Sequence, residues 1–219
     1  SYDTALSLYP MDLFAAQALT LSIQRYGQNE RTLFSFLEAT GQGSLQSFVE
    51  GKHTTYSLAD VYDYDIYNFY SYLSEINADS AAWTSIRVSL ERVEGLFEGD
   101  IATAAIALVK TIGMINLFGK AGVQLDKKAL SVYARTALGI HSPGEIIDLL
   151  TQHKIIRYAT YKSQYILFEG TDVNIEGELL KAAGIVPRSK DVIDKLLTNF
   201  NLPIEFANAS YFRKGTPRY

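Results

Sequence analysis

The chain has 219 residues, an apolar fraction of 47% and a formal net charge of −4. This is enough apolar sequence for one large domain or two small ones with packed cores. The absence of cysteine excludes disulfides and thiolate chemistry and fits a reducing cytoplasm. The sequence contains no uninterrupted run of about 18 apolar residues and no basic leader before an apolar segment. We therefore expect a cytoplasmic protein without a membrane span or signal peptide.

The charge is divided unevenly along the chain. Residues 1–100 contain 5 Lys and Arg against 14 Asp and Glu, which gives −9, whereas residues 101–219 contain 15 against 10, which gives +5. The acidic first part argues against nucleic-acid binding there, and the mildly basic second part permits it.

Helical spacing of apolar residues predicts helices over residues 12–25, 29–39 and 45–50, with Asp12 capping the first. Asn29 is expected to cap the second helix. The apolar residues of that helix are expected to form its buried face: Leu33, Phe34, Phe36 and Leu37.

The polar residues Asn29, Glu30 and Arg31 form the densest polar cluster of the sequence, at the start of this second helix. A cation in the first turn gains nothing from the helix dipole, which favours anions there. Arg31 is therefore a candidate to bind an outside carboxylate or phosphate. The alternative is a structural ion pair with a neighbouring helix.

The stretch 58–73 is rich in tyrosine, and helix and strand compete for it because Tyr62, Tyr64 and Ile66 recur at period two. We predict a helix, since one stripe continues at steps of three and four: Leu58, Tyr62, Ile66, Phe69 and Leu73. Ser57 and Asp60 resemble a capping box at its start. The stripe favours core packing over a base-stacking platform, and we expect Asp60, Asp63 and Asp65 to form a solvated face that repels phosphates.

Beyond this stretch, the sequence predicts helices over about 80–94, 101–118, 127–138 and 143–153, followed by strands at 154–160 and 164–169 joined by a tight turn. The helix at 101–118 is apolar nearly all round and is expected to be central. Three helices followed by a β-hairpin is the order of a winged helix. The tail predicts helices at 174–183 and 189–200 and an extended end from Pro203.

The predicted fold is thus mainly α: a helical bundle, a winged-helix module of three helices plus a β-hairpin, and a short α/β tail. We place the predicted domains at residues 1–97, 98–170 and 171–219, with the first boundary in the break between Gly95 and Gly99.

No residue pattern predicts a catalytic or metal site. The segment Gly113–Ala121 superficially resembles a phosphate-binding loop, but its glycines are one residue too far apart and Ala121 replaces the Ser or Thr that binds magnesium. It also continues a predicted helix. The three histidines lie far apart, without carboxylates at metal-ligand spacing, and no nucleophile elbow is present.

The predicted recognition helix 143–153 carries Glu145 and Asp148, so it is poorly suited to DNA. Four residues in and beside the hairpin are candidates for weak contact with a nucleic-acid backbone: Lys154, Arg157, Tyr161 and Lys162. The alternatives are protein binding and structural packing.

Tyr9-Pro10, the first helix and the string Tyr26-Gly-Gln-Asn-Glu-Arg-Thr-Leu-Phe-Ser-Phe-Leu37 resemble a group of large bacterial P-loop ATPases of the AAA/STAND kind. Several of these are associated with phage-defence and restriction-like systems. The residues resemble the start of their helical lid, and the segments 58–64, 108–113 and 215–218 are also similar. Neither a Walker A nor a Walker B element lies within the chain.

The resemblance implies a non-catalytic fragment that couples nucleotide state to the winged-helix module, which contacts DNA or a defence-system protein. ATP and magnesium would bind the missing ATPase core of the same chain, and no cofactor would bind the fragment. Asn29, Glu30 and Arg31 would sense the nucleotide, with Arg31 facing it. The opening at Ser1 without Met is consistent with this expectation. The alternative is a stand-alone interaction domain that docks another protein through the tyrosine-rich helix 58–73.

Overall fold

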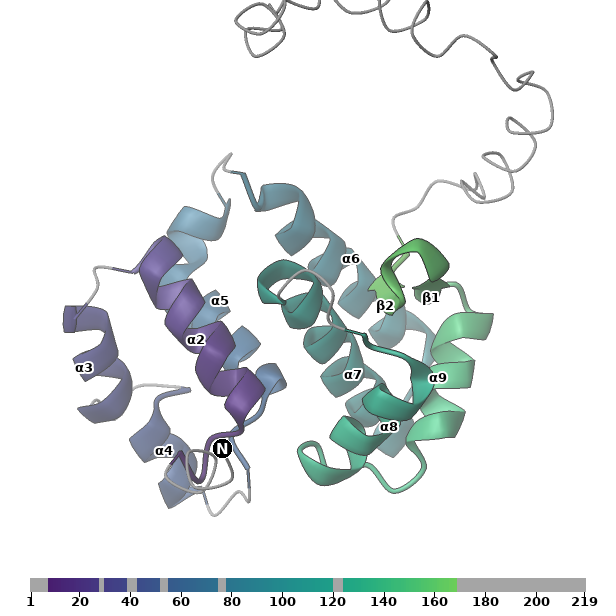
Figure 1. The fold of residues 1–219 in the computed structure, drawn as a ribbon, viewed down its shortest axis with the longest axis horizontal. Coiled ribbons are helices and arrows are strands. Elements are labelled where there is room, and N and C mark those ends of the chain that lie inside the picture. Colours follow the sequence, from purple (N-terminus) through teal and green to yellow (C-terminus); the bar gives the residue numbers. More distant parts are fainter. Residues whose placement is uncertain are drawn as a thin grey trace, which may run out of the picture. The chain divides into compact units, whose positions relative to one another are not determined.

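The computed structural model describes residues 8–27, 30–38, 43–51, 55–74, 78–119 and 124–168. The chain divides into two compact units, Ser1–Glu169 and Gly170–Tyr219. The described residues all lie in the first unit, so the helices and extended end predicted for 171–219 lie outside them. The described part contains eight α-helices and one two-stranded antiparallel sheet (Figure 1), which confirms the mainly α prediction. The predicted boundary at residue 97 falls inside the first unit.

The first five helices come from the acidic part of the chain: α2 (Leu13–Tyr26), α3 (Glu30–Glu38), α4 (Leu45–Glu50), α5 (Leu58–Ser74) and α6 (Ser80–Leu96). Asp12 caps α2, as predicted, because its Oδ1 accepts the N–H groups of Phe14 and Ala15 at 2.8 and 2.9 Å. The N–H of Asp12 donates to the carbonyl of Tyr56 at 3.0 Å. This bond ties the beginning of α2 to the segment that leads into α5.

The tyrosine-rich segment is the helix α5, and its predicted apolar stripe is largely buried. The capping box forms in part, because Asp60 Oδ2 accepts the backbone N–H of Ser57 at 2.8 Å and also its hydroxyl at 2.7 Å. Tyr62 and Tyr64 are buried, and this burial raises the pKa of each to about 12. Core packing therefore governs this helix.

The expectation that Asp65 belongs to a solvated face of α5 is wrong. Asp65 is fully buried, whereas the Asp63 carboxylate is exposed and pairs with Lys110 of the central helix at 2.6 Å. Asp65 follows the buried residues Val61 and Tyr62 by four and three positions, so the helix turns it into the core.

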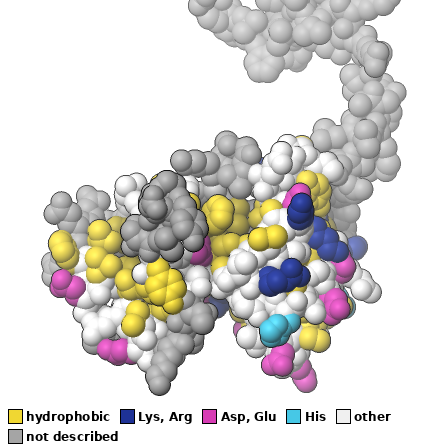
Figure 2. Space-filling model, turned by 60° about the horizontal axis from the view of Figure 1, so that its bottom comes forward, with side chains coloured by type: hydrophobic (Ala, Val, Ile, Leu, Met, Phe, Trp, Pro, Cys, Tyr) yellow, Lys and Arg dark blue, Asp and Glu magenta, His cyan; other side chains and the backbone are white. Residues whose placement is uncertain are grey.

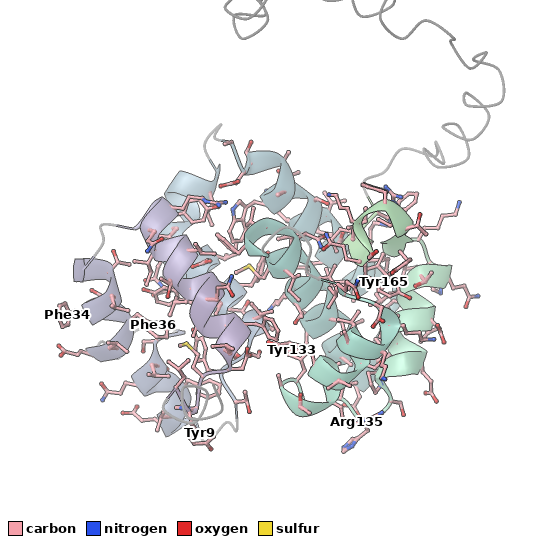
Figure 3. All side chains as sticks on the ribbon, viewed as in Figure 1. Tyr9, Phe34, Phe36, Tyr133, Arg135 and Tyr165 are labelled. Atoms are coloured by element: carbon pink, nitrogen blue, oxygen red, sulfur yellow. The ribbon has the colours of Figure 1, made fainter. Side chains whose placement is uncertain are left out.

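The apolar face predicted for α3 is also wrong in most of its residues. Only Phe36 is buried, at 1% exposure, and its ring meets Tyr56 and Tyr64 edge-on at 5.5 and 5.0 Å. Phe34 is 58% exposed and points away from the other helices (Figure 3). Leu33 and Leu37 are exposed too. The short helix α3 packs mainly against the even shorter α4, which cannot cover a wide face.

Helix α7 (Gly99–Phe118) is the central helix, as predicted, and packs against α2, α5, α6 and other elements of the unit. Among the described residues it is the one helix long and apolar enough to cross a membrane. Its contacts on several sides account for its apolar composition within the unit.

The last described elements are α8 (Lys127–Thr136), α9 (Pro143–Gln152), β1 (Ile156–Ala159), a 3-10 turn (Thr160–Lys162) and β2 (Gln164–Leu167). The strands pair antiparallel, with Ile156 opposite Leu167 and Ala159 opposite Gln164. Asp126 caps α8, and Pro143 begins α9, both as predicted. Leu125, just before α8, forms a single bridge to Gln164. Both α9 and β2 pack on α7, so the hairpin rests on the central helix.

Candidate functional site

The structure places the predicted nucleotide-sensing residues only in part. Asn29 lies outside the described residues, and the backbones of Glu30 and Arg31 form the start of α3. Their side chains are outside the described part. Helix α3 stands at the left edge of the unit in Figure 1, next to α4.

The candidate nucleic-acid-binding residues lie at two places along the hairpin. Tyr161 and Lys162 are in the exposed 3-10 turn, where Tyr161 is 66% exposed and Lys162 Nζ lies 5.8 Å from the centre of its ring. Lys154 precedes β1 at the opposite end of the strand from this turn, and Arg157 is half-buried within β1. The structure therefore brings Tyr161 and Lys162 together and keeps Lys154 apart from them along the hairpin.

Lys154, which follows the end of α9, has a backbone conformation that is unusual for a lysine. Its φ of 53° is left-handed, its N–H donates to Thr151 O at 3.0 Å, and the N–H of Ile155 donates to Leu150 O at 2.9 Å. Arg92 of α6 donates to the carbonyls of His153 and Lys154, each at 3.0 Å. These bonds fix the path of the chain after α9 and the position of the hairpin that follows.

The outward face of α9 is acidic, as the sequence predicts. Glu145 and Asp148 are exposed, and Asp148 accepts a hydrogen bond from Lys127 of α8 at 2.5 Å. This charge pattern repels phosphates and leaves the helix poorly suited to the major groove.

The exposed basic residues of α8 were missed by the sequence analysis: Lys127, Lys128 and Arg135. Arg135 projects away from the unit in Figure 3, and Lys and Arg side chains gather on the right part of the surface in Figure 2. The spacing of seven between Lys128 and Arg135 places them on one helical face, a signal that the sequence contains.

Tyr133 of α8 contacts the beginnings of α2 and α5, two helices that are distant from it in the sequence. Its hydroxyl donates to Asp12 Oδ2 at 2.6 Å and accepts the N–H of Leu58 at 3.0 Å. Its ring also meets Phe14 edge-on at 5.9 Å. We call Tyr133, Asp12 and Leu58 the Tyr133 junction. Through it, α8 is fastened to the start of α2 and the start of α5.

Burial dominates the electrostatics of the Tyr133 junction. It raises the pKa of the Tyr133 phenol, and the nearby Asp12 carboxylate raises it further. Burial also raises the pKa of Asp12, although the hydrogen bonds from Tyr133 and from two backbone N–H groups act in the opposite direction. The phenol is thus a permanent donor at neutral pH. No local sequence pattern indicates the contact between Tyr133 and Asp12, because the two residues are 121 positions apart.

The described residues contain no group of three His, Cys, Asp or Glu that could hold a metal ion. The segment that superficially resembles a phosphate-binding loop is helical from Gly113 to Phe118, since both residues belong to α7. This confirms the prediction that the segment continues a helix, which ends at Phe118. Within residues 113–118 the backbone N–H groups belong to the helix, so this part of the segment offers no cradle of free N–H groups.

No family model matches the chain, and no curated protein and no solved structure shows a match to it.

Proposed function

We propose that the chain is a non-catalytic coupling segment of a larger bacterial P-loop ATPase of the AAA/STAND kind, acting in the cytoplasm in a phage-defence or restriction-like system. ATP and Mg²⁺ belong, in this proposal, to an ATPase core outside these residues. The resemblance of residues 26–37 motivates it. The observation that carries the coupling is the Tyr133 junction, because Tyr133 hydrogen-bonds to Asp12 and Leu58 at once. A displacement of α2 or α5 would therefore act directly on α8.

We further infer that α7, α8, α9 and the β1–β2 hairpin form a winged-helix module. The order of the elements supports this, as does the pairing of Leu125 with Gln164 in front of α8. The hairpin turn with Tyr161 and Lys162 would be the wing. Because the α9 face carries Glu145 and Asp148, the module is better suited to a protein partner than to reading bases.

A second candidate is contact with a nucleic-acid backbone, favoured by the exposure of Tyr161 and the cation beside it. Lys154 and Arg157 would add charge to that contact. The third possibility is docking of a partner protein through the tyrosine-rich helix α5. Tyr67, at 60% exposure, is the one exposed tyrosine among the described side chains of α5.

ATP hydrolysis by the product of the complete reading frame tests the coupling proposal. We expect hydrolysis by that product, none by this chain alone, and altered hydrolysis in Tyr133→Phe but not in Tyr158→Phe, whose exposed ring contacts Tyr165 of the hairpin. Arg31→Ala is expected to lower hydrolysis if Arg31 faces the nucleotide; an unchanged rate would make Arg31 structural. A product that neither binds nor hydrolyses ATP would overturn the proposal.

A salt titration with duplex DNA tests the second candidate. Binding through phosphates is strong at about 50 mM salt and weakens steeply toward about 200 mM. Binding that is lost in Lys162→Glu and retained in Lys128→Glu would assign it to the hairpin turn. Absence of binding at the lower salt concentration would remove DNA as a partner and leave the protein-facing role.

A further inference from the structure

A cavity of about 130 Å³ lies where α2, α5, α7 and α8 meet. Its floor consists of buried apolar side chains: Ala18, Leu58, Met114, Phe118 and Leu125. Phe14, which is 50% exposed, and the exposed Ala129 stand at its rim, so the cavity is open to solvent on one side. Tyr133 also lines it, with its hydroxyl engaged by Asp12 and Leu58.

The chemistry of the described lining favours an uncharged ligand. No Lys, Arg, Asp or Glu lines the cavity among the residues that the structure describes. A charged group would lose its hydration there without gaining a partner of opposite charge. The polar lining consists of the Tyr133 phenol and the amides of Gln17 and Gln124. Gln17 is half-buried and Gln124 is exposed, so neither belongs to the buried floor of the cavity. They can accept or donate one hydrogen bond to the outer edge of a ligand.

We propose that this cavity binds a small uncharged aromatic compound, between benzene and indole in size. An apolar cavity of about 150 Å³ in another protein is known to stay dry and to bind benzene. A ring placed among Met114, Phe118 and Leu58 gains dispersion contacts with these apolar side chains and removes apolar surface from water. The flexible thioether of Met114 can adapt to ligands of slightly different shape.

A ligand in this position would touch side chains from both sides of the Tyr133 junction. Phe14 and Ala18 come from α2, Met114 and Phe118 from α7, and Ala129 from α8. Binding would therefore hold α8 against α2 and would stabilise the folded unit against heat and denaturant. This inference is independent of the proposed ATPase function, because it concerns the intact 219-residue chain alone.

Titration of the purified chain with benzene, phenol and indole tests the proposal. The chain contains two methionines, Met11 and Met114. Met114 lines the cavity and Met11 does not, so their methyl groups report directly in an NMR spectrum of methyl-labelled protein. We expect a saturable shift of the Met114 methyl signal, a much smaller response of Met11, and a rise in the melting temperature. Benzoate, the charged analogue, is expected to leave both signals unchanged.

Ala129→Leu should fill the rim of the cavity and weaken binding by at least about tenfold. The matched control is Ala81→Leu, at an exposed position of α6 outside the cavity. If Ala129→Leu fails to fold, the titration of the natural chain decides the question by itself. The proposal is overturned if none of the three compounds shifts the Met114 signal saturably, if benzoate binds as well as phenol, or if Ala129→Leu binds as tightly as the natural chain.

Discussion

The hydroxyl of Ser22 on α2 lies 2.9 Å from Asp65 Oδ1 on α5, and both side chains are inaccessible to solvent. The same hydroxyl lies 3.0 Å from the carbonyl of Leu19. One proton cannot satisfy two acceptors, and Asp65 Oδ2 has no hydrogen-bond partner in the described part of the structure. A protonated Asp65 resolves this conflict by donating to Ser22, which then donates to Leu19. Burial raises the pKa of Asp65 well above 3.8 and favours this state.

Stability is therefore expected to fall as the pH rises from about 4 toward neutral. The folded state keeps a proton on Asp65 that the unfolded chain releases above its own pKa near 3.8, so the loss continues until the pH passes the raised folded-state pKa. Within that window, Asp65 contributes a slope of about 1.4 kcal/mol for each pH unit. Asp65→Asn should remove this slope and be more stable than the natural chain at pH 7.

Urea unfolding between pH 4 and pH 8 measures how the stabilities of Asp65→Asn and the natural chain depend on pH. Asp63→Asn is the matched control, because Asp63 lies on the same helix but is exposed and paired with Lys110. The control should retain the slope of the natural chain. Parallel pH profiles for Asp65→Asn and the natural chain would show that Asp65 is ionised in the folded state.

Tyr133→Phe is expected to lower the free energy of unfolding by about 2 kcal/mol, the range for a hydrogen bond to a charged acceptor. The ring would remain, including its contact with Phe14, and only the bonds to Asp12 and Leu58 would be lost. Tyr158→Phe, which removes the hydroxyl of an exposed residue, should change stability by less than about 0.5 kcal/mol. Equal effects of the two variants in chemical denaturation would argue against the Tyr133 junction.

The two phenylalanines of α3 should differ sharply on truncation. Phe36→Ala is expected to cost about 3 kcal/mol or more, because it empties a buried site between Tyr56 and Tyr64. Phe34→Ala is expected to cost less than about 0.5 kcal/mol, since that ring is mainly exposed. Thermal unfolding of the two variants side by side is the measurement. A large loss for Phe34 would mean that another part of the chain covers it.

The features that the sequence predicted correctly depend on neighbouring residues. Asp12 and Asp126 cap helices because each accepts N–H groups two or three positions ahead. The stripe of α5 is visible at steps of three and four, and the two strands are joined by a turn only a few residues long. Each of these signals is complete within one turn of helix or one hairpin.

The features that were missed depend on contacts between distant segments. The partners of Tyr133, Asp12 and Leu58, lie 121 and 75 positions away, and no local pattern indicates them. The spacing of Asp65 from Val61 and Tyr62 places it on the buried face of α5. We predicted an exposed residue because a carboxylate is usually solvated. The helical period placed Phe34 on the predicted apolar face of α3, but the neighbouring helix α4 is too short to cover that ring, which is exposed.

Arg92→Ala tests the attachment of α9 to α6. The substitution removes the hydrogen bonds to the carbonyls of His153 and Lys154. At this helix end, Lys154 adopts the left-handed conformation that glycine usually takes. We expect a loss of about 1 kcal/mol and faster hydrogen exchange at the amides of Lys154 and Ile155. Arg87→Ala is the control, because Arg87 is exposed and its ion pair with Glu91 is long, at 4.0 Å. Unchanged exchange in Arg92→Ala would show that the helix end holds without it.

Two glycines inside helices should respond to alanine in opposite directions. A Cβ at Gly113 of α7 would lie 2.5 Å from Ile86 Cγ1, whereas a Cβ at Gly95 of α6 would meet nothing within 4 Å. Gly95→Ala is expected to stabilise by about 0.5–1 kcal/mol, because alanine restricts the unfolded chain and suits the helix. Gly113→Ala is expected to destabilise by about 1–3 kcal/mol through overpacking between α6 and α7.

A double-mutant cycle with Ile86→Ala isolates the steric cause. Truncation removes both Ile86 atoms closest to the new methyl group, Cγ1 and Cδ1. Gly113→Ala should therefore cost less in the Ile86→Ala background than in the natural chain, with a coupling of about 1 kcal/mol or more. Urea unfolding of the four proteins gives this coupling directly. If the cost of Gly113→Ala is the same in both backgrounds, the close approach of α6 and α7 at this point is not what requires the glycine.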